Sequence, residues 1–253
     1  MFLSLCFLSS IIIYNLCAYA KRLEAEPFTN VNSHTNVTNV TNVTNVNSDT
    51  NVTNATDKVD CDNSINDISN KNTSTSIILL GDSILKNNAY VNPNYSVEYL
   101  LKNSCKKNMY CLAKDGAGIK AVYKQMAKIP DRLNTVDSII FLSIGGNDLL
   151  EKTSKVEIIF RQYEQLARDI KIRFNKCKIV VMNLYITPSM QKNMVLRHKI
   201  IQWNNLLKDY ALKQNIDLIP LDTLLYEPID FVEQYEPSEI GGVKIVKAIM
   251  LTV

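Results

Sequence analysis

A serine at the end of a short apolar run is the first residue of this chain that could carry out chemistry. After Ser76, residues 77–80 form a continuous apolar run that begins with two β-branched side chains, which is typical of a buried strand, and Gly81, Asp82 and Ser83 follow at once. In open α/β sheets, ligands bind at the carboxyl ends of the strands. A serine hydroxyl placed at such an end becomes a nucleophile if a base lies beside it.

Two later turns offer the hydrogen-bond donors that such a nucleophile needs. An apolar run at 109–113 is followed by a turn that contains Gly116, and another at 138–144 is followed by a turn that contains Asn147. The backbone N–H of Gly116 and the side-chain amide of Asn147 could stabilise the oxyanion of an acyl-transfer intermediate. Two carboxylates lie next to these residues in the sequence, and we assign them to ligand binding: Asp82, before Ser83, and Asp148, after Asn147.

The elements between these turns must bring them to one edge. Strand-like runs alternate with amphipathic helical runs along the chain, the latter at about residues 96–103, 119–128, 154–174, 193–214 and 240–251. This alternation predicts a parallel sheet with helices on both faces, so that the turns share its carboxyl edge. Residues 222–235, before the last helix, are expected to be irregular.

In this order, the three turns resemble three sequence blocks of the SGNH (GDSL-like) hydrolase family. The resemblance covers residues 76–253 and implies a flavodoxin-like three-layer α/β/α domain with a five-stranded parallel sheet. It implies ester or carbohydrate-ester hydrolysis, with Ser83 as nucleophile and Gly116 and Asn147 as oxyanion donors. The expected partner is a small-molecule or glycan ester, and we expect neither a cofactor nor a metal.

The fourth block departs from the family pattern. The family has an Asp, two residues and then the catalytic His, whereas this chain has Glu233 and Glu236 before a matching Pro-Ser turn. An ordinary Glu, with a pKa of about 4.3, is a weak base for a serine hydroxyl. Burial or a second carboxylate nearby raises its pKa and makes it a better one. The two histidines are poor replacements, because His34 lies in a low-complexity tract and His198 on a charged helical face.

Three interpretations of this site remain open. In the first, Ser83 works with Glu236, and Glu233 beside it, as an unusual base. In the second, the chain is a catalytically impaired relative that binds an acyl or glycan ligand in the same cleft. In the third, the carboxylates and Asp82 serve a metal-assisted reaction, for which the sequence shows no supporting ligand spacing.

The amino-terminal part carries different signals. Residues 1–20 are apolar and end in Ala18-Tyr19-Ala20, which predicts a signal peptide or an uncleaved membrane anchor. Residues 21–75 are rich in Asn and Thr and poor in large apolar side chains, which predicts a disordered low-complexity stalk. Its Asn-x-Thr and Asn-x-Ser sequons indicate a glycoprotein that is secreted, lumenal or extracellular, unless they reflect compositional drift. A further hypothesis makes this stalk the functional part. The sequons are Asn36, Asn39, Asn42, Asn51, Asn54 and Asn72, with Asn94 further on.

Charge and cysteine content narrow the function classes. The net charge of +3 is small and the basic residues are scattered, so nucleic-acid binding is not expected. Four cysteines follow residue 20, without a CxxC pair or a histidine cluster that would indicate zinc. They are either free thiols or paired, and one possible pair is local. These cysteines are Cys61, Cys105, Cys111 and Cys177.

Overall fold

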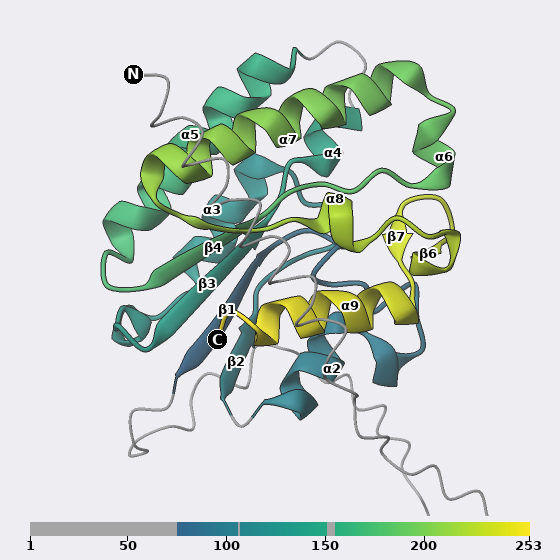
Figure 1. Ribbon diagram of the computed structural model, residues 1–253. Helices are drawn as coiled ribbons and strands as arrows, with labels where there is room; N and C mark the ends of the chain where they lie inside the picture. The colour runs from purple at the N-terminus through teal and green to yellow at the C-terminus, as the bar shows by residue number, and fades with distance from the viewer. Residues whose placement is uncertain (1–74, 106, 151–154) are drawn as a thin grey trace, which may run out of the picture. The chain divides into compact units, whose positions relative to one another are not determined.

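The computed structural model describes residues 75–105, 107–150 and 155–253, and the expected signal peptide and nearly all of the expected stalk lie outside these ranges. The described part is built on a five-stranded sheet in the order β2-β1-β3-β4-β5, in which every neighbouring pair is parallel (Figure 1). This order is flavodoxin-like, and the predicted fold class is confirmed. The strands are β1 (Ser76–Gly81), β2 (Asn108–Cys111), β3 (Ser138–Ser143), β4 (Lys178–Met182) and β5 (Asp217–Ile219).

Helices cover both faces of this sheet and complete three layers (Figure 1). On one face, α3 (Ile119–Ala127) packs against α5 (Val156–Arg173), and α5 packs against α7 (Met194–Gln214). On the other face, α2 (Val97–Ser104) packs against α9 (Glu239–Met250). Every residue of β1 and β3 is buried, as expected for strands covered on both sides.

A buried glutamine fixes the end of β1. Gln125 Nε2 donates to the carbonyl of Gly81 at 2.7 Å, and the N–H of Gly81 donates to Gln125 Oε1 at 2.8 Å. Gly81 has a φ of +144°, and a Cβ there would lie 1.9 Å from the carbonyl oxygen of Ser143. Only glycine fits this close approach of two strands, at the point where the chain leaves β1 and continues to Ser83.

The main correction to the expected layout concerns residues 222–235, which are not irregular throughout. This region contains a 3-10 helix (Pro228–Asp230) and the first strand of an antiparallel hairpin, β6 (Phe231–Val232) with β7 (Glu236–Pro237). It also contains most of a short helix, α8 (Leu221–Leu224), and two more short helices follow β3 and β4: α4 (Gly146–Leu150) and α6 (Pro188–Gln191). Each of these elements is too short to show a period in the sequence.

Two further features bear on the sequence-based expectations. In the described ranges, no helix combines the length and apolar character needed to cross a bilayer. The possible local pair is Cys105 with Cys111, and both are free thiols; Cys105 Sγ donates to the carbonyl of Leu101.

Candidate active site

A pocket of about 60 Å³ lies where the segments after β1, β3 and β4 meet the β6–β7 hairpin. Ser83, Asp82, Asn147 and Glu236 all line it, although they come from three distant parts of the chain. The structure therefore brings together four of the residues that the sequence marked for the site.

Ser83 and Glu236 are in direct contact. Ser83 Oγ donates a hydrogen bond to Glu236 Oε1 at 3.1 Å, which is within the reach expected of a nucleophile and its base. Burial raises the pKa of Glu236, and the charges of Asp115 and Glu233 raise it further, while the hydrogen bond from Ser83 lowers it. A Glu with a raised pKa accepts a proton near neutral pH more readily than an exposed Glu does.

Three side chains hold the backbone on both sides of Glu236. Tyr185 OH donates at 2.7 Å to the backbone carbonyl of Tyr235, the residue before Glu236. Thr187 Oγ1 donates at 2.8 Å to the backbone carbonyl of Gln234. Asn87 Nδ2 donates at 3.1 Å to the backbone carbonyl of Pro237, the residue after Glu236. These bonds fix the hairpin strand against the loops that follow β1 and β4, so Glu236 has little freedom to leave Ser83.

Asp82 is buried directly beside the nucleophile. Its Oδ1 accepts a hydrogen bond from the N–H of Ile84 at 3.1 Å, and only 2% of the residue is exposed. Burial raises the pKa of Asp82 to about 8, and the nearby charges of Glu236 and Asp148 also raise it. At neutral pH Asp82 therefore carries a proton and can donate a hydrogen bond.

The two expected oxyanion donors lie on neighbouring loops of the same edge. Asn147 Nδ2 donates to the carbonyl of Ala117 at 2.9 Å, which ties the turn after β3 to the loop of Gly116. A side-chain amide has two N–H donors, so this bond leaves one for a ligand. Gly116 is exposed, has a φ of +68° and is not among the residues that line the pocket.

Three other residues that the sequence analysis considered have different surroundings. Asp148 Oδ2 accepts from the N–H of Ile119 at 3.0 Å, which joins α4 to the first residue of α3. Glu233 is exposed in the hairpin turn with a φ of +54° and acts on Glu236 through its charge. His198 is exposed on α7, and none of the three lines the pocket. The catalytic role of Glu233 and the ligand-binding role of Asp148 stay predictions.

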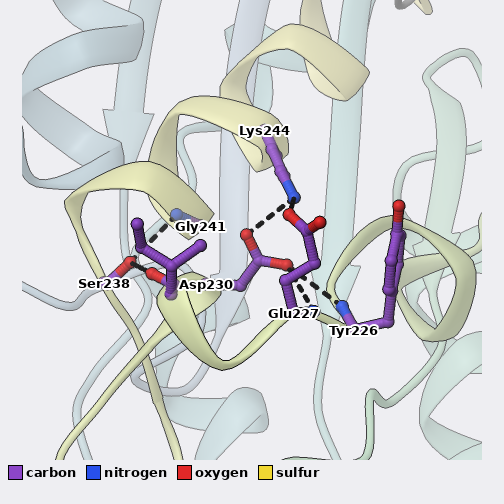
Figure 2. A network of polar contacts seen from close by, with 7 residues as sticks. Tyr226, Glu227, Asp230, Ser238, Gly241 and Lys244 are labelled. Atoms are coloured by element: carbon purple, nitrogen blue, oxygen red, sulfur yellow. Dashed lines mark hydrogen bonds and ion pairs between the residues drawn. The ribbon is translucent and has the colours of Figure 1, made fainter.

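An ion-pair network anchors the segment that leads into the hairpin (Figure 2). The fully buried Asp230 lies 2.7 Å from Lys244 Nζ on α9, and its Oδ2 accepts from the N–H groups of Tyr226 and Glu227. Lys244 Nζ also lies 3.3 Å from the Glu227 carboxylate. The network joins α9 to the segment that directly precedes β6, and so it fixes the start of the hairpin.

We expect Lys244→Met to lower the free energy of unfolding by about 3 kcal/mol, because it leaves the Asp230 carboxylate buried without its cation. Urea unfolding measures this change. Lys213→Met, which removes an exposed lysine from α7, is the control and is expected to change the free energy by less than about 0.5 kcal/mol. Equal losses in the two variants would contradict the role given to the ion pair.

Several residues of the site gave no signal in the sequence. Leu196 and Ile200 of α7 line the pocket, and Tyr90 OH donates to the Asp115 carboxylate at 2.9 Å in the segment that also carries Gly116. The amphipathic pattern of residues 193–214 predicted a helix, but periodicity does not say which cavity a buried side chain faces.

Solved structures that resemble this chain share its fold. A member of the lipolytic protein G-D-S-L family from Veillonella parvula DSM 2008 is 21% identical, with a TM-score of 0.59 over 70% of this chain and 96% of that one. An acetyl xylan esterase is 15% identical, with a TM-score of 0.57 over 70% and 99% of the two chains. An extracellular lipase from Streptomyces rimosus is 15% identical, with a TM-score of 0.53 over 71% and 100%.

A match to a family model shows the family to which this chain belongs. A search of curated proteins finds no relative that matches this chain. The model of the GDSL-like Lipase/Acylhydrolase family matches residues 79–239, which is most of the part that the structure describes. This match confirms the resemblance seen in the three turns, and the chain belongs to the GDSL-like lipase/acylhydrolase family.

Proposed function

We propose that this chain is a serine hydrolase of ester bonds, an esterase or carbohydrate-ester deacylase in which Glu236 replaces the usual His as the base. The observation that carries the proposal is the 3.1 Å hydrogen bond from Ser83 Oγ to Glu236 Oε1 at the wall of a pocket. Membership of a hydrolase family supports the same reaction class.

The proposed reaction has two acyl-transfer steps. Glu236 takes the proton of Ser83 as Oγ attacks the ester carbonyl, and the Asn147 amide stabilises the oxyanion. Gly116 does not line the pocket, and the same role for its N–H stays a prediction. Collapse of the intermediate breaks the ester C–O bond, and the leaving alcohol takes the proton from Glu236. Water then attacks the acyl group on Ser83 with Glu236 again as base, which releases the acid and restores the hydroxyl.

The charge state of the pocket supports this role for Glu236. A base must be deprotonated, and a second carboxylate with a negative charge nearby would oppose that. Asp82, with a pKa of about 8, is neutral at pH 7 and so adds no negative charge beside Glu236. The pair therefore divides into one neutral and one ionisable carboxylate, as in other sites where two carboxyl groups have different roles.

A second candidate function is a non-catalytic relative that binds an acyl or glycan ligand in the same pocket. The observation that favours it is that no histidine lines the pocket within the described residues, and the Ser83 hydroxyl instead donates to the Glu236 carboxylate. A binder needs the pocket and the donors but not an activated serine.

A fluorophosphonate probe separates these two functions. We expect the purified chain to be labelled and to hydrolyse p-nitrophenyl acetate, and Ser83→Ala to abolish labelling and lower hydrolysis by about 10³-fold or more. Ser104→Ala, at an exposed position at the end of α2, is the control and is expected to behave as the wild type. Absence of labelling at every pH from about 5 to 9 would reject the hydrolase and favour the binder.

A further inference from the structure

The pocket beside Ser83 has an apolar wall that the proposed reaction does not use. Six of the side chains that line it are hydrocarbon or thioether groups: Ile84, Leu150, Leu184, Met190, Leu196 and Ile200. Four of these six are no more than 7% exposed, and the exceptions are Leu150 and Met190. Such a wall binds an uncharged hydrocarbon group, because contact with it removes apolar surface from water.

The wall is held in place by hydrogen bonds to the chain behind it. The N–H of Leu184 donates to Asn204 Oδ1 at 3.0 Å, and Asn204 Nδ2 donates to the carbonyl of Leu184 at 2.6 Å. Asn204 is buried on α7, the helix that also supplies Leu196 and Ile200. The loop after β4 and α7 therefore form one unit, and a larger ligand cannot separate them without breaking two buried hydrogen bonds.

The size of the pocket limits what it can hold. A cavity needs roughly 10–15 Å³ of such volume to hold one water, so a volume of about 60 Å³ suits a small group and not a long hydrocarbon chain. A methyl or methylene group is similar in size to water. An ester whose carbonyl carbon lies beside Ser83 Oγ would therefore fit the pocket better with a short acyl group than with a long one.

From this wall and this volume we propose that the pocket binds the acyl group of the substrate and restricts it to short, uncharged acyl groups. The inference rests on the proposed function and adds the substrate class to it. The polar residues of the same pocket, Ser83, Asn147 and Glu236, would then lie around the carbonyl, and the alcohol part of the ester would face solvent.

Hydrolysis of a chain-length series tests this inference. The full chain is assayed with p-nitrophenyl acetate, butyrate, hexanoate and decanoate, and kcat/KM is expected to be highest for the first two and at least about tenfold lower for decanoate. Leu196→Ala removes part of the apolar wall, which enlarges the pocket, and it is expected to shift the preference toward longer acyl chains. Ile200→Val is a milder variant that gives a smaller shift in the same direction if the first fails to fold.

A matched control lies on the same helix. Leu212→Ala removes an exposed leucine from α7 and is expected to keep the wild-type preference. A wild-type kcat/KM for decanoate equal to or above that for acetate, or unchanged preferences in both wall variants, would overturn the short-acyl inference alone. Failure to hydrolyse any ester of the series would instead overturn the proposed function, and the inference with it.

Discussion

Glu236→Gln is expected to lower kcat/KM for ester hydrolysis by about 10²- to 10⁴-fold, the usual contribution of a general base. Gln has the same shape and can still contact Ser83 Oγ, but it cannot take the proton. Steady-state kinetics with p-nitrophenyl acetate measures the loss. Glu157→Gln, at an exposed position on α5, is the matched control and is expected to keep wild-type activity.

The pH profile of the wild type gives the same role a second readout. Only the carboxylate form of Glu236 can accept a proton, so kcat/KM should rise with pH through the pKa of this group. Because burial raises that pKa, the rise should lie above pH 4.5. Glu233→Gln removes a charge that also raises this pKa, and we expect the rise to move to lower pH.

Substituting the His of the family pattern at position 236 tests the role of this position as the base in a second way. In Glu236→His, the base is an imidazole, and the rise in kcat/KM should follow its ordinary pKa of about 6.5. If Glu236→Gln kept wild-type activity and fluorophosphonate labelling, the carboxylate would have no part in the reaction. If both Glu236 variants were inactive while the control stayed active, the position would matter but imidazole would not fit it.

The sequence predicted those parts of the molecule that have local causes. The buried strands are continuous apolar runs, and Ser83, Gly116 and Asn147 each follow such a run, so the order of the elements was enough to place them at one edge. Glu236 was found because a family pattern aligned it with a base, and no periodicity in the sequence pointed to it.

The features that could not be predicted from the sequence depend on contacts between segments that are distant in the chain. The hairpin that carries Glu236 is held by Tyr185, Thr187 and Asn87 through its backbone carbonyls, and any residue at the accepting positions would serve. Asp148 is a related case: its place in the turn predicts a ligand-binding carboxylate, and only the structure shows that it also accepts from the first N–H of α3. Such partners follow from packing and not from spacing.

Asp82→Asn is expected to remove a large pH dependence from the stability of the fold. The pKa of Asp82 is about 8 in the folded protein, against an ordinary value of 3.8. Between these two pH values, the folded state holds a proton that the unfolded chain has released. Unfolding therefore releases a proton, and the free energy of unfolding falls as pH rises through this window, by roughly 1.4 kcal/mol for each pH unit.

Asn has the shape of Asp, can accept from the N–H of Ile84 as Asp82 does, and does not titrate. Urea unfolding at pH 5, 6 and 7 should therefore show Asp82→Asn gaining roughly 3 kcal/mol relative to the wild type across this range. The control is Asp137→Asn, which changes an exposed carboxylate. A difference between wild type and Asp82→Asn that stays constant with pH would mean that Asp82 is already ionised at pH 5. Its charge would then oppose ionisation of Glu236, and the division of the two carboxylates into a neutral group and a base would fail.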